Sequence, residues 1–72
     1  MTVEQLPKIK GWIARNKEHH ELIFVPGEEP PTRMVNYWFA GFAWGYTKIQ
    51  DVFPELTWED EPIEVELIIQ KL

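Results

Sequence analysis

The sequence predicts a small all-β domain, from its alternating segments, its turn residues and its many strand-forming side chains. In the clearest segment, apolar residues occupy alternate positions, namely Ile63, Val65, Leu67 and Ile69. A period of two is typical of a strand with one buried face. Short strands joined by turns favour an antiparallel meander or a partly closed five-stranded SH3-like barrel, with a one-turn helix before the last strand. A flat sheet covered by an N-terminal helical turn is the alternative.

The first part of the chain predicts a hairpin. Residues 1–7 are expected to form a short tail or turn. Residues 8–15 (KIKGWIAR) alternate as a strand does, and Gly11 marks a bulge or the close approach of another side chain. Residues 16–20 are polar and suit a turn, and residues 21–25 (ELIFV) are rich in strand formers. A loop of about four or five residues would join the two strands.

The second part of the chain predicts a rigid loop followed by three strands. Residues 26–33 (PGEEPPTR) contain three prolines and a glycine, which exclude a helix or a central strand. Residues 34–40 and 44–50 are expected to form the third and fourth strands. Residues 51–53 suit one helical turn, capped by an aspartate and ended by a proline. The alternating segment described above then forms the last strand.

Composition limits the classes of function. The 72 residues form one domain, 1–72, and such a short chain buries only about 60% of its unfolded surface. Without cysteine the chain has no disulfides, which fits a reducing compartment, and we expect a cytoplasmic protein. The N-terminus has no apolar run of signal-peptide length, and no segment approaches the ~20 apolar residues of a membrane span. The net charge of −5 disfavours direct binding to nucleic acid or anionic membranes.

The residues available for catalysis are few. The chain has neither serine nor cysteine, so its four threonines are the only residues left for nucleophilic attack by an aliphatic hydroxyl. His19 and His20 lie between two glutamates, and such a set could bind a divalent metal. Adjacent side chains on a strand point to opposite faces, however, so a solvated hairpin turn is the favoured interpretation. We therefore expect no catalytic residue, no metal and no cofactor.

Six acidic residues and no basic one lie between residues 55 and 66. A solvated face with charged strand edges is one explanation. A calcium site is a weak one, because the EF-hand spacing is absent. The third explanation is an acidic surface that binds a basic partner, and Glu59, Asp60 and Glu61 would supply its charge. Such a surface could also imitate DNA phosphates.

The aromatic run over residues 37–46 has two explanations. It could form a large aromatic core, which is the favoured interpretation. Alternatively, since a small sheet cannot easily bury both faces, Trp38, Phe42 and Trp44 could be exposed together. An exposed aromatic patch with a polar rim is typical of a binding surface, where such side chains dominate the affinity.

Three segments carry a resemblance to a known group of proteins. They are GWIAR at residues 11–15, PTR at residues 31–33 and FPELTWEDEPIEVEL at residues 53–67. Together they resemble a group of short uncharacterised bacterial proteins associated with gut anaerobes and their phages or mobile elements. The resemblance implies a short stand-alone protein and no particular activity.

From these observations we expect a non-enzymatic module that binds another protein. Trp38, Phe42 and Trp44 would be its apolar anchors, and Glu59, Asp60 and Glu61 would provide charge complementarity. One alternative is an accessory domain of a metal-dependent or oligomeric enzyme. Another is an acidic DNA-mimic inhibitor of a nucleic-acid-binding protein. The sequence determines neither the partner nor the oligomeric state.

Overall fold

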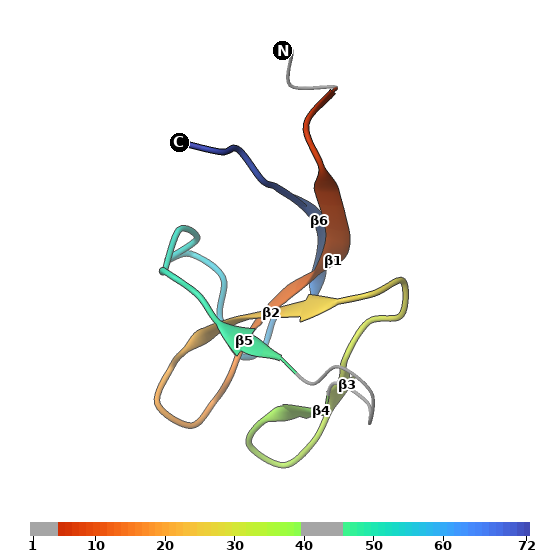
Figure 1. Ribbon diagram of the computed structural model, residues 1–72. Helices are drawn as coiled ribbons and strands as arrows, with labels where there is room; N and C mark the ends of the chain where they lie inside the picture. Colours follow the sequence, from red (N-terminus) through yellow and green to blue (C-terminus); the bar gives the residue numbers. More distant parts are fainter. Residues whose placement is uncertain (1–4, 40–45) are drawn as a thin grey trace.

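The computed structural model describes residues 5–39 and 46–72, which form two antiparallel sheets (Figure 1). The larger sheet has the spatial order β5–β2–β1–β6. Its strands are β1 (Lys8–Arg15), β2 (Leu22–Pro26), β5 (Thr47–Lys48) and β6 (Ile63–Ile68). The smaller sheet pairs β3 (Thr32–Arg33) with β4 (Trp38–Phe39). An all-β fold is therefore confirmed, but over the described residues the larger sheet is open, and neither a closed barrel nor a simple meander forms.

The expected helical turn at residues 51–53 is absent, and this prediction was wrong. These residues have no regular structure, and a turn follows at residues 54–55. The turn is closed by the amide of Leu56, which donates to the carbonyl of Phe53 at 3.0 Å. Asp51 does not cap a helix, because both of its carboxylate oxygens accept hydrogen bonds from Arg15. The carboxylate thus pairs with a distant strand, in addition to a local hydrogen bond from the backbone of Phe53.

The third and fourth strands are shorter than predicted. The segment expected as a rigid loop contains β3, and only the end of the expected third strand pairs, as β4. Between them a tight turn is closed by the amide of Met34, which donates to the carbonyl of Tyr37 at 2.9 Å. Within the described part of the expected fourth strand, only β5 pairs with the larger sheet.

The hairpin of β1 and β2 is the centre of the fold, and its predicted strands are confirmed to within one residue. Arg15 pairs with Leu22 at the closed end, so residues 16–21 form the loop. His19 and His20 both adopt positive φ angles there, 65° and 54°. Gly11 allows a close approach, as predicted. A Cβ at this position would lie 2.5 Å from the carbonyl oxygen of Val25 and 2.6 Å from the ring of Phe24.

The hairpin has apolar residues on both faces, and a separate cluster of side chains covers each face. On one side, which we call the Leu56 face, the core consists of Ile13, Leu22, Phe24 and Leu56. On the opposite side, which we call the Trp38 face, it consists of Ala14, Ile23, Val25 and Trp38. Trp58 packs on the Trp38 face only two residues after Leu56 packs on the other. The chain therefore crosses from one face to the other over residues 56–58.

The last strand, β6, lies at the edge of the sheet and is less buried than its alternation suggests. It pairs with β1, with Ile13 opposite Ile63 and Lys8 opposite Ile68. Of its apolar residues only Val65 packs against the core, whereas Ile63 and Leu67 are each 44% exposed. Leu56 and Ile49 lie at the closed end of the hairpin, where their backbones bond to Arg15 and Leu22. Toward the open end of the Leu56 face, Ile9 and Leu67 are 39% and 44% exposed.

Candidate functional site

The predicted acidic residues lie in an ordered turn between Leu56 and β6. The amide of Asp60 donates to the carbonyl of Thr57 at 3.1 Å. In return, the Asp60 carboxylate accepts hydrogen bonds from the amide of Thr57 at 2.8 Å and from its hydroxyl at 3.2 Å. Asp60 therefore stabilises the turn, and its charge is partly engaged within the chain. Glu59 and Glu61 are exposed on the same turn.

Arg33 braces the acidic turn from the smaller sheet. One of its terminal nitrogens donates to the carbonyl oxygens of Glu59 and Asp60, both at 3.2 Å, and lies 3.9 Å from the carboxylate of Glu61. The guanidinium group also lies 4.7 Å from the ring centre of Trp38 and 5.1 Å from that of Trp58. A cation over an aromatic face is attracted by the negative ring quadrupole. This contact fixes the position of the turn relative to the sheet.

Trp38 belongs to the core, which corrects the expectation of an exposed anchor. Its side chain is 2% exposed. The indole N–H donates to the carbonyl of Arg15 at 2.9 Å, and its backbone amide donates to the side-chain oxygen of Asn16 at 3.1 Å. Its ring centre lies 5.4 Å from that of Trp58. The alternation of the segment is preserved, since the flanking Tyr37 and Phe39 are exposed.

Phe42 and Trp44, the other two predicted anchors, fall outside the described residues. Their role in partner binding stays a prediction. Of the six predicted site residues, the structure thus places the three acidic ones together at the surface, with Trp38 behind them in the core. The bracing of the turn by Arg33 was not predicted, since no local pattern links that residue to residues 59–61.

A second unpredicted feature is the buried side chain of Arg15, which is 5% exposed. Two of its nitrogens donate to the two carboxylate oxygens of Asp51 at 2.9 and 2.8 Å. The remaining N–H groups reach three carbonyl oxygens, those of His20 and Phe53 at 2.9 Å and that of Leu56 at 2.8 Å. A guanidinium has five N–H donors, so all of them are satisfied.

The Arg15–Asp51 pair shifts the acid–base behaviour of both groups in the expected directions. The hydrogen bonds from Arg15 lower the pKa of Asp51, and those to Asp51 raise the pKa of Arg15. Both shifts favour the charged forms. At neutral pH the pair therefore ties the hairpin loop to the segment that covers the Leu56 face.

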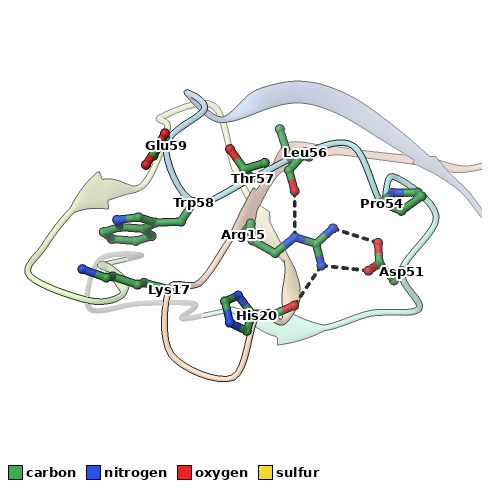
Figure 2. Close-up of a pocket in the computed structure, with 9 residues that line it drawn as sticks. All are labelled: Arg15, Lys17, His20, Asp51, Pro54, Leu56, Thr57, Trp58 and Glu59. Atoms are coloured by element: carbon green, nitrogen blue, oxygen red, sulfur yellow. Dashed lines mark hydrogen bonds and ion pairs between the residues drawn. The ribbon is translucent and has the colours of Figure 1, made fainter.

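A depression of about 570 Å³ lies beside this pair (Figure 2). Lys17 and Trp58 line one side, and Asp51 and Pro54 line the other. Because all the donors of Arg15 are engaged within the protein, this side chain has none left for an anionic ligand. The other polar side chains that line the depression include Lys17, His20 and Glu59.

The two histidines do not form a metal site with their neighbours. His19 lies 3.6 Å from the carboxylate of Glu18 at the exposed loop. Over residues 5–39 and 46–72, no three histidine, cysteine or acidic residues are grouped so as to hold a metal ion. No helix in the same part of the chain has the length and hydropathy that a bilayer crossing requires.

Comparisons with known proteins identify no relative. No family model, no curated protein and no solved structure matches this chain. The resemblance to short bacterial proteins therefore stays an expectation.

Proposed function

We propose that this protein is a non-enzymatic module that binds another protein through its acidic surface. The observation that supports the proposal most directly is the ordered acidic turn. Its backbone is held by Arg33 and by the carboxylate of Asp60, while the carboxylates of Glu59 and Glu61 extend into solvent. A turn that is already ordered loses little conformational entropy when a partner binds.

The charge distribution supports a basic partner. Acidic residues continue from the turn into the last strand at Glu64 and Glu66, and the whole chain carries a net charge of −5. A concentrated negative field accelerates encounter with a positive surface, and the effect weakens as salt screens it. Arg33 offsets part of this field near Glu61, so Glu59 is the residue of the turn most available for a partner.

The role proposed for the aromatic residues changes with the structure. Trp38 would act by positioning Arg33, and through it the acidic turn, without touching the partner itself. Phe42 and Trp44 remain proposed apolar anchors. Binding would then combine charge at the turn with apolar contacts from the segment that follows β4.

Affinity capture from a lysate of the host cell tests the proposal. The test protein carries Glu59→Gln and Glu61→Gln, and Asp60 is kept because its carboxylate holds the turn. The matched control carries Glu28→Gln and Glu29→Gln, which removes the same charge from an exposed loop elsewhere. We expect a partner that is retained at low salt, released at moderate salt, and lost only from the turn variant.

An equal loss from both variants would show that net charge alone drives the capture and would overturn the proposal. Retention by both variants would also overturn it. Release of the partner by duplex DNA would add that the acidic surface occupies a nucleic-acid site, as a phosphate mimic would.

A further inference from the structure

The outer edge of β6 is the long free edge of the larger sheet. Over the described residues, β6 pairs with β1 on one side and with no strand on the other. The opposite edge of the sheet is β5, which has only two residues. β6 has six residues, so its edge offers a much longer row of backbone groups (Figure 1). Long unpaired edges accept strands from other chains.

The hydrogen-bond pattern identifies the backbone groups that face outward. The amide of Ile69 donates to the carbonyl of Pro7 at 3.0 Å, next to the paired residues Lys8 and Ile68. In an antiparallel pair, hydrogen-bonded positions alternate. The odd-numbered residues of β6 therefore bond to β1. The N–H and C=O groups of Glu64, Glu66 and Ile68 point away from the sheet.

The side chains along this edge define the chemistry of an added strand. Glu64 forms no ion pair with the described residues, and the carboxylate of Glu66 lies 4.0 Å from the ammonium group of Lys8. Ile63, Leu67 and Ile68 are each 44–45% exposed. An added strand with basic residues opposite the glutamates and apolar residues opposite the others would satisfy both sets.

We propose that the outer edge of β6 binds an extended basic and apolar segment of a partner protein, as an added antiparallel strand. In the partner's own direction its pattern is apolar–apolar–basic–apolar–basic–apolar, opposite Ile68 to Ile63. The inference rests on the proposed function, since it names the kind of segment that the acidic surface recognises. Main-chain bonds supply affinity, and the alternating side chains supply specificity.

A second copy of this chain fits the edge less well. When β6 pairs antiparallel with β6 of a second copy, residues directly opposite each other must lie on the same face of the sheet. The register centred on Val65 places Glu64 opposite Glu66, and the register centred on Glu66 places that residue opposite itself. These two registers use most of β6, and like charges directly opposite each other are destabilising. The remaining registers pair only short stretches of the strand.

Hydrogen exchange with a synthetic peptide tests the proposal. The probe is the capped peptide Ile-Val-Lys-Val-Lys-Val, and the control has glutamate in place of both lysines. We expect the probe to slow exchange at the amides of Glu64, Glu66 and Ile68, whereas Val65 and Leu67 are already protected by β1. The control peptide should leave all of these amides unchanged. Protection of the outward amides without any peptide, growing with protein concentration, would show that a second copy occupies the edge and would overturn the proposal.

N-methylation of the peptide distinguishes the contribution of strand pairing to binding from that of charge. A methyl group on the amide of the lysine opposite Glu66 blocks a bond to the edge and should weaken binding about tenfold. A methyl group on the amide of the preceding valine, which faces away, should have little effect. Equal binding of the two methylated peptides would overturn the proposal.

Two variants of the protein make the same separation. Glu66→Gln removes the charge and should weaken binding a few-fold. Glu66→Pro removes the charge and also the outward N–H, without breaking a bond to β1. Edge strands tolerate proline at such an outward-facing position. We expect Glu66→Pro to bind about tenfold less tightly than Glu66→Gln. Equal peptide binding by these variants would reject the strand pairing even if lysate capture still depends on Glu59 and Glu61, so the two proposals fail separately.

Discussion

Replacing Arg15 with lysine should destabilise the fold severely while leaving its charge unchanged. Lysine has one ammonium group and cannot reach the five acceptor positions that the guanidinium occupies. The carbonyl of Leu56 is buried and would lose the hydrogen bond from the Arg15 side chain. The carbonyls of His20 and Phe53 are partly buried, so water can replace part of their loss.

The burial of these carbonyl groups determines how much stability Arg15→Lys should remove. A buried polar group left unsatisfied costs about 1–3 kcal/mol, and the partly buried ones add less. We expect Arg15→Lys to lower the free energy of unfolding by about 2–3 kcal/mol. A chain of 72 residues has a total stability of only about 4–11 kcal/mol. The midpoint of thermal unfolding should therefore fall by roughly 10–20 °C.

Urea unfolding followed by tryptophan fluorescence measures the effect. Arg33→Lys is the matched control, because the bonds of Arg33 go to exposed carbonyls and its loss should cost less than about 1 kcal/mol. A loss at Arg15→Lys no larger than at Arg33→Lys would refute the structural role assigned to the buried guanidinium.

Three further predictions concern the same core. Gly11→Ala should lower the free energy of unfolding by about 2 kcal/mol or more, since the added Cβ meets a backbone oxygen at 2.5 Å. Urea unfolding checks this prediction, with Lys10→Ala as the control variant. Trp38→Phe should cost about 2–3 kcal/mol, because it removes a buried bond to the Arg15 carbonyl. Trp12→Phe should cost less than about 1 kcal/mol, because the buried indole N–H of Trp12 has no hydrogen-bond partner among the described residues. Similar losses in both variants, measured by urea unfolding, would contradict this difference. The lowered pKa of Asp51 contributes stability above the carboxyl pKa of the unfolded chain, about 3.9, and this stability is lost as the pH falls through the lower folded value. Thermal unfolding at decreasing pH should show this loss in the native protein, and a smaller one after Asp51→Asn.

The sequence predicts the elements that depend on local patterns. Alternation and turn residues identify the hairpin and the start of β6, and the close approach at Gly11 is anticipated from a glycine within a strand. In the segment around Trp38 the alternation is also correct, but it does not say which set of side chains faces the core. That choice depends on the position of the hairpin, which no local pattern encodes.

The interactions missed by sequence analysis join distant segments. Arg15 binds carbonyl oxygens 38 and 41 residues away, and a backbone carbonyl has no signature in the sequence. Asp51 fits an N-cap locally, and only the proximity of Arg15 makes the ion pair the better arrangement. The exposure of β6 was missed for a similar reason, because the covering segment ends over the other half of the sheet.

The passage of the chain around the hairpin has a consequence for how quickly the protein folds. The β1–β2 hairpin closes a loop of six residues, 16–21, whereas the contact between Arg15 and Leu56 spans 41 residues. The longer closure costs roughly 2 kcal/mol more chain entropy. The hairpin is therefore expected to form early, and attachment of residues 49–68 to both of its faces and to its edge should limit the rate. Stabilising substitutions in this wrapping segment should therefore speed folding, because their contacts begin to form in the rate-limiting step.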